Sequence, residues 1–114
     1  MNTLHLILKS KWFDMIADGV KNEEYREITE YWCRRICTYG KVKRGFCKKN
    51  VCNIDCNCQL PSCKANVPTE ITHVCFHRGY TNDKMWVEIA GISRGKGKAE
   101  WGAPDHETFI IKLK

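Results

Sequence analysis

The sequence has no uninterrupted apolar run near the roughly 18 residues that a membrane-spanning helix needs, so it predicts no membrane span. Residues 1–9 lack the basic head, long apolar middle and small-residue cleavage site of a signal peptide. Only 3 Pro and 8 Gly occur among 114 residues, with 43% hydrophobic and 28% charged side chains, which excludes a disordered or fibrous chain. We expect one globular domain, residues 1–114, located in the cytoplasm.

The eight cysteines are the most unusual feature of the composition. In a secreted chain they would suggest a disulfide scaffold, but the reducing compartment expected here favours metal ligands or free thiols. The net charge of +6 is compatible with a nucleic-acid partner but does not identify one.

The periodicity of apolar residues predicts an α+β fold. Helical spacing and helix-start residues indicate short helices over 11–18 and 30–37, with Ser10 and Thr29 as N-caps. Alternation and β-branched residues indicate strands over 3–9, 71–76, 85–92 and 108–113. The segment 22–28 is charged but contains Tyr25 and Ile28 and is too short for a helix, so we interpret it as a further strand with a polar face. Five strands and two short helices near the N-terminus predict a small curled sheet or β-barrel.

Residues 41–64 form a basic, cysteine-rich insertion within this domain. The segment has few large apolar residues and no helical or strand period, so it cannot supply a core. Tetrahedral zinc would organise such a loop because metal binding replaces the missing apolar burial. Free thiols or disulfides are the alternative, since no Cys-x-x-Cys pair occurs. The candidate zinc ligands are four of Cys47, Cys52, Cys56, Cys58 and Cys63.

The densest group of charged residues follows a glycine turn and lies at the start of the second predicted strand. On a strand, Glu24 and Arg26 point to the same face, and Lys21 lies beside them. The carboxylate could accept from an exocyclic amine and the guanidinium could donate to a phosphate or a base edge. The alternative is a solvated strand whose charges form local ion pairs.

The pattern Gly19-x-Lys21-x-x-Glu24-x-Arg26 after an apolar short helix resembles the ASCH domain, a PUA-like β-barrel. The resemblance covers about residues 4–37 and 71–113, and is strongest to small standalone bacterial and phage members. It does not cover the cysteine-rich insertion. It implies a cleft that binds RNA or a nucleotide-like ligand along Lys21, Glu24 and Arg26. Further similar segments are Trp12–Ile16, Phe76–Tyr80 and Glu100–Gly102.

Some members of this family hydrolyse acylated cytidines with a Lys and a Thr three residues apart and a distant Glu. This chain keeps Lys21 but has Glu24 at the position of the Thr, and a carboxylate is a poor substitute for a hydroxyl nucleophile. The alternative function is therefore a small hydrolase acting on an N-acylated cytidine or on RNA, with Lys21 and Glu24 as its acid–base pair. The sequence names no protein partner.

Two further groups are candidates for chemistry. We expect Arg78 and Tyr80 to line the same cleft and contact a nucleic-acid ligand through phosphate pairing and base stacking; the alternative is a turn in which Tyr80 packs over a sheet edge. His73, Cys75 and His77 would share one face of a strand, where a metal site or a Cys–His pair is conceivable, although no third group is evident to orient the base.

A third hypothesis for the function of the whole chain is an interaction protein that works through a zinc-bound loop, residues 41–64.

Overall fold

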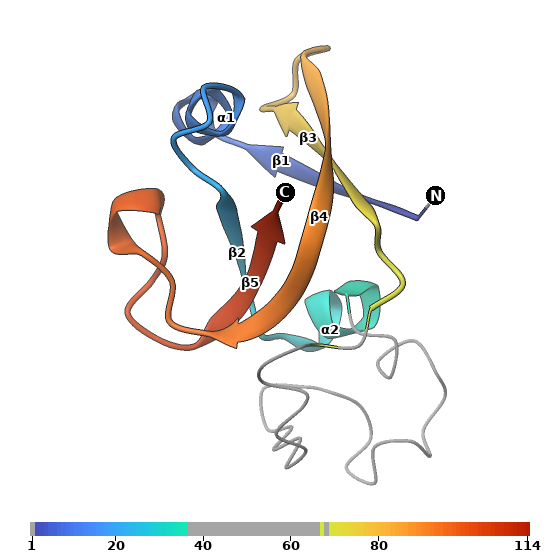
Figure 1. Cartoon of the computed structure of the whole chain (residues 1–114), viewed down its shortest axis with the longest axis vertical. Coiled ribbons are helices and arrows are strands. Elements are labelled where there is room, and N and C mark those ends of the chain that lie inside the picture. Colours follow the sequence, from blue (N-terminus) through green and yellow to red (C-terminus); the bar gives the residue numbers. More distant parts are fainter. Residues whose placement is uncertain (1, 37–66, 68) are drawn as a thin grey trace, which may run out of the picture.

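The computed structural model describes residues 2–36, 67 and 69–114. These residues form a five-stranded mixed sheet that bends into a half-barrel, with the strand order β1-β3-β4-β5-β2 (Figure 1). The elements are β1 (Thr3–Leu8), α1 (Ser10–Ala17), β2 (Glu23–Glu27), α2 (Glu30–Ile36), β3 (His73–Arg78), β4 (Lys84–Gly95), a 3₁₀ turn η1 (Ala99–Trp101) and β5 (Thr108–Leu113).

The sheet curls because one long strand belongs to both of its halves. β4 is 12 residues long and pairs antiparallel with β3 through its first part and with β5 through its last part. The register shifts between Ile89 and Gly91, and such an irregularity bends a strand and increases its twist. Figure 1 shows β4 sweeping around the domain in a continuous curve. The curl leaves β1 and β2 as the two edges of the sheet.

The hydrophobic core fills the concave side of the sheet. In β1 the alternation observed in the sequence is reproduced, because Leu4, Leu6 and Leu8 are buried while His5 and Ile7 are exposed. Side chains of this kind each stabilise a fold by about 1.5–3 kcal/mol when fully buried. Other strands and α1 add further buried side chains to the same cluster, including Phe13, Ile16, Val74, Phe76, Ile92, Phe109 and Ile111.

The predicted strands and helices are all present, with shifted ends. The fourth predicted strand continues past residue 92 to Gly95, because its last residues pair with β5 down to Thr108. Thr29 caps α2 as expected, since its Oγ1 accepts the backbone N–H of Trp32 at 3.3 Å. The prediction that Ser10 caps the first helix is wrong: Ser10 is the first residue of α1, and the capping position is Lys9, which makes no side-chain cap bond.

The cysteine-rich insertion, residues 41–64, lies outside the described residues. The zinc site expected there, formed by four of Cys47, Cys52, Cys56, Cys58 and Cys63, therefore stays a prediction. In the part of the chain that the structure describes, no helix has both the length and the apolar character needed to cross a membrane.

Candidate functional site

A cleft of about 540 Å³ lies where the two edge strands of the sheet approach each other. β1 and β2 supply opposite parts of its wall, and α1, α2 and η1 complete the rim. Arg26 links the two edges, because its Nη2 donates to the carbonyl of Ile7 at 3.3 Å. The lining residues are His5, Ile7, Leu8, Lys9, Trp12, Glu24, Tyr25, Arg26, Tyr31, Trp32, Trp101 and Gly102.

The structure brings Lys21, Glu24 and Arg26 together, as the sequence predicts. After α1, Gly19 adopts a positive φ of 77°, a conformation that glycine tolerates best, and the chain turns into β2. The backbone N–H of Lys21 then bonds to the carbonyl of Met15 at 3.1 Å. Glu24 and Arg26 alternate along β2 and both line the cleft.

Lys21 lies behind Glu24 rather than in the cleft. Only 1% of Lys21 is exposed, and its Nζ donates to the carbonyl of Glu23 and to Glu24 Oε1, the latter at 3.1 Å. The ammonium also lies 5.3 Å from the centre of the Tyr25 ring. Burial lowers the pKa of Lys21, and the neighbouring Glu24 carboxylate opposes this effect. The prediction that Lys21 lines a solvent-reachable surface is therefore wrong, and its position suits it to hold Glu24.

Glu24 has one oxygen with several donors and one with none. Its Oε1 accepts from Lys21 Nζ and from the backbone N–H of Tyr25 at 3.0 Å, and lies 3.6 Å from Arg26 Nη1. Its Oε2 is buried and has no hydrogen-bond partner among the described residues. A buried acceptor without a donor is unfavourable by about 1–3 kcal/mol or more. A ligand in the cleft that donates a hydrogen bond would relieve this cost.

Arg26 is held by the protein but retains donors for a ligand. Its Nη1 donates to the Tyr25 carbonyl at 2.6 Å, and its guanidinium carbon lies 5.5 Å from the centre of the Trp32 ring. Burial lowers the pKa of Arg26, and the Glu24 carboxylate opposes the effect. Because a guanidinium has five N–H donors, the two contacts to backbone carbonyls leave others for a ligand in the cleft.

Aromatic side chains form much of the cleft wall, and the sequence did not reveal this. Trp12, Trp32 and Trp101 come from α1, α2 and η1 and gather only in the fold. Trp12 packs so closely on Gly102 that a Cβ on this glycine would lie 2.9 Å from the indole. The spacing of these tryptophans along the chain gives no sign of a shared surface.

Arg78 and Tyr80 do not line the cleft, contrary to expectation. Arg78 forms ion pairs with Asp14 at 2.6 Å and with Asp83 at 3.3 Å, and its guanidinium lies over the Phe13 ring. Tyr80 lies on the turn between β3 and β4 with 95% of its surface exposed. The charge of Arg78 is thus already paired within the fold, and contact of either residue with a nucleic acid elsewhere stays a prediction.

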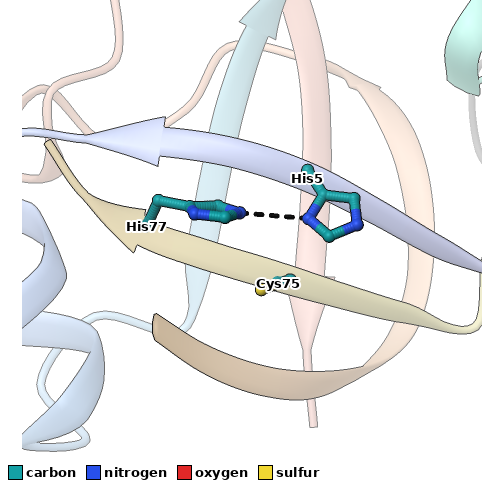
Figure 2. Close-up of side chains that lie close together, drawn as sticks. All are labelled: His5, Cys75 and His77. Atoms are coloured by element: carbon teal, nitrogen blue, oxygen red, sulfur yellow. Dashed lines mark hydrogen bonds between the residues drawn. The ribbon is translucent and has the colours of Figure 1, made fainter. Parts of the chain in front are cut away.

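A second cluster of side chains lies on the other side of β1 and β3 from the buried residues Leu6, Val74 and Phe76, because side chains alternate along a strand. Figure 2 shows its three members, His5, Cys75 and His77. The ligating atoms of His5, Cys75 and His77 all lie within 4.8 Å of one another, and His5 Nδ1 is 3.0 Å from His77 Nε2. Burial lowers the pKa of His77, assisted by His5 and Lys84. Burial also raises the pKa of the Cys75 thiol, against the effect of Lys84.

His5 is the third side chain of this cluster, and the sequence alone could not identify it. β1 and β3 are parallel neighbours in the register His5↔Cys75, so His5 joins Cys75 and His77 from the adjacent strand. His73 was expected in this group, but it lies outside the cluster, and its Nδ1 is 2.8 Å from Thr72 Oγ1.

Comparison of the chain with models of protein families, with curated proteins and with solved structures finds no match.

Proposed function

We propose that this chain is an ASCH-like, PUA-type β-barrel domain that binds RNA or a modified nucleotide in the cleft between β1 and β2. The observation that carries the proposal is the buried Glu24 Oε2, which has no donor among the described residues although Glu24 lines an aromatic cleft. The Gly19-x-Lys21-x-x-Glu24-x-Arg26 pattern contributes the family resemblance, and the curled five-stranded sheet is compatible with a barrel of that kind.

The cleft offers the three interactions that an unpaired nucleobase requires. Indole rings such as Trp12 and Trp32 provide stacking surfaces, worth about 1–3 kcal/mol per base. Glu24 Oε2 would accept from an exocyclic amine, and Arg26 would donate to a base carbonyl or a phosphate. The cleft volume of about 540 Å³ falls among those of small-molecule sites. An amine-bearing base, such as cytosine or adenine, therefore fits this cleft better than uracil.

Lys21 has a positioning role in this proposal. Its contact with Glu24 Oε1 at 3.1 Å directs one carboxylate oxygen into the protein, so that Oε2 is the oxygen left for the ligand. The net charge of +6 would further favour a phosphate-bearing ligand over a neutral one.

The proposal is tested by titrating the protein with the four ribonucleosides and with short single-stranded RNAs at one fixed salt concentration. Tryptophan fluorescence is the readout, because Trp12, Trp32 and Trp101 line the cleft. We expect cytidine, adenosine or guanosine to quench it more than uridine does, and Arg26→Ala to weaken binding by about 1–3 kcal/mol. Glu24→Gln should reduce the preference for amine-bearing bases.

The matched control is Lys96→Ala, which removes the same charge from a side chain that is 71% exposed and does not line the cleft. We expect its affinity to equal that of the unaltered protein. Absence of binding to every nucleoside and RNA would overturn the proposal, and so would an equal loss in Lys96→Ala and Arg26→Ala, because the interaction would then be unspecific.

A second function, hydrolysis of an N-acylated cytidine or of RNA, is favoured by the lowered pKa of Lys21 and its contact with Glu24. In this case Lys21 and Glu24 would act as the acid–base pair, and Glu24 is the member that lines the cleft. Incubation with an N-acylated cytidine and with RNA, followed by chromatography, separates the two functions. Turnover that is lost in Glu24→Gln would support the hydrolase, whereas binding without turnover supports the binding module.

A further inference from the structure

We propose that His5, Cys75 and His77 bind a divalent transition-metal ion, with zinc as the ion that suits the donors best. The site lies on the face of the sheet opposite the hydrophobic core, across the parallel strands β1 and β3 (Figure 2). It is separate from the cysteine-rich insertion and does not depend on the proposed function of the cleft.

The distances between the donor atoms already approach those of a metal site. In a tetrahedral zinc site, two nitrogen ligands lie about 3.3 Å apart, and a nitrogen and a sulfur lie about 3.6 Å apart. Here His5 Nδ1 and His77 Nε2 are 3.0 Å apart, and the Cys75 Sγ lies within 4.8 Å of both nitrogens. The three residues thus place one donor atom each close enough together to approach a single ion.

The fold holds these three residues rigidly. Cys75 and His77 alternate along β3 and so share one face, while the side chains between and before them, Phe76 and Val74, are fully buried in the core. The parallel register places His5 directly opposite Cys75. Figure 2 shows the His5 and His77 rings turned toward each other across the two strands, with Cys75 beside them. Ligands on paired strands are preorganised, which favours binding.

The chemistry of the donors selects the ion. Two imidazole nitrogens and one thiolate suit zinc and its first-row neighbours, whereas magnesium and calcium prefer oxygen ligands. No carboxylate belongs to the cluster in the part of the chain that the structure describes. Cys75 is fully buried on β3, and its sulfur lies beside the two imidazoles.

Three protein ligands leave a fourth coordination position for water or for a bound molecule. His5 also lines the cleft, so the metal would lie at the edge of the cleft rather than at a remote point of the surface. His5 thus belongs both to the lining of the cleft and to the proposed metal site.

The experiment is a zinc titration followed by NMR of the histidine side chains, under reducing conditions. A residue-specific readout is needed because the sequence also has five cysteines between 47 and 63, so total metal content does not assign a site. We expect the ring signals of His5 and His77 to shift and those of His73 and His106 to stay in place. His77→Ala and Cys75→Ser should each weaken zinc binding at this site at least about tenfold.

His73→Ala is the matched control, since His73 lies on the same strand but outside the cluster. It should bind zinc at His5 and His77 as the unaltered protein does. Thermal unfolding without metal checks that each variant folds, and His5→Gln replaces any variant that does not. Unshifted His5 and His77 signals at excess zinc would overturn the proposal, as would equal losses of affinity in His73→Ala and His77→Ala.

Discussion

At the scale of single residues, Glu24 contacts one buried cation, Lys21, and one partly buried cation, Arg26. Its Oε1 lies 3.1 Å from Lys21 Nζ and 3.6 Å from Arg26 Nη1, and the side chains of these cations are only 0% and 17% exposed. Charges removed from water need a partner, and removal of one member of a buried pair is strongly unfavourable. The carboxylate therefore matters for folding as well as for any ligand.

Glu24→Gln should lower the free energy of unfolding by about 3 kcal/mol, because it leaves the buried Lys21 without an anionic partner at Oε1. Urea denaturation at pH 7 measures this change. The control is Glu27→Gln on the same strand. The Glu27 carboxylate contacts His106 at the surface, so this substitution should lower the free energy of unfolding by less than about 1 kcal/mol. Equal losses in the two variants would show that the cations do not depend on Glu24.

Tyr25 predicts a dependence of stability on alkaline pH. Burial is the main cause that raises the pKa of Tyr25 from 10.0 to about 12, and the hydrogen bond to Glu23 adds to it. The folded protein therefore keeps the phenol proton where the unfolded chain has lost it. The resulting stability, about 3 kcal/mol, is fully present below pH 10 and is lost between pH 10 and 12.

Tyr25→Phe removes the phenol whose raised pKa makes stability depend on pH. The free energy of unfolding of this variant should therefore fall less steeply between pH 10 and 12 than that of the unaltered protein. Denaturant titrations at several pH values measure the slope. Tyr80→Phe is the control, because Tyr80 is 95% exposed, and it should keep the original slope. Identical slopes for Tyr25→Phe and the unaltered protein would contradict the assignment of this pH dependence to Tyr25.

At the scale of elements, the two helices begin in different ways. α2 starts after Thr29, whose hydroxyl accepts the N–H of Trp32, and Trp32 belongs to the cleft wall. α1 starts without a side-chain cap, because the chain leaves β1 at Leu8 and Ser10 is already helical. The first turn of α1 is instead held by the N–H groups of Trp12 and Phe13, which both bond to the Lys9 carbonyl.

Thr29→Ala should destabilise the protein by about 0.5–2 kcal/mol, because it removes the acceptor for a helix N–H. It should also increase the mobility of Trp32, which fluorescence anisotropy can detect. Ser10→Ala removes the same hydroxyl group from a helix start that makes no cap bond, and should stay within about 0.5 kcal/mol of the unaltered protein. A larger effect of Ser10→Ala than of Thr29→Ala would refute this assignment of the caps.

At the scale of the whole molecule, the cleft exists only in the folded chain. Its wall combines residues from β1, β2, α1, α2 and η1, and positions as distant in sequence as His5 and Gly102 face the same space. A ligand that binds there cannot bind the unfolded chain in the same way. Binding is therefore coupled to global stability.

A nucleoside or RNA at about 100 times its dissociation constant should raise the free energy of unfolding by about 2.7 kcal/mol. Thermal or urea denaturation with and without ligand measures this increase. At the same ligand concentration, the free energy of unfolding of Arg26→Ala should rise by less than that of the unaltered protein. That of Lys96→Ala should rise by the same amount. Binding without any increase in stability would place the ligand outside the folded cleft.

The sequence by itself determined the local structure. Alternation of apolar residues identified most of the strands, and helical spacing identified α1 and α2. The two-residue period of a strand placed Glu24 and Arg26 on one face of β2, where their side chains contact each other. Thr29 was recognisable as a cap from its position before a helical pattern. These features depend on residues within a few positions of one another, so neighbouring side chains and backbone geometry are enough to decide them.

Only the tertiary structure decided which distant residues meet. The parallel pairing of β1 with β3 placed His5 rather than His73 beside Cys75, and the curl of β4 brought the edges of the sheet close enough for Arg26 to reach Ile7. It also buried Lys21 and left Tyr80 outside the cleft. The reason is physical: strand order and sheet curvature arise from packing of the whole core, and no local pattern records which strand edges will face each other.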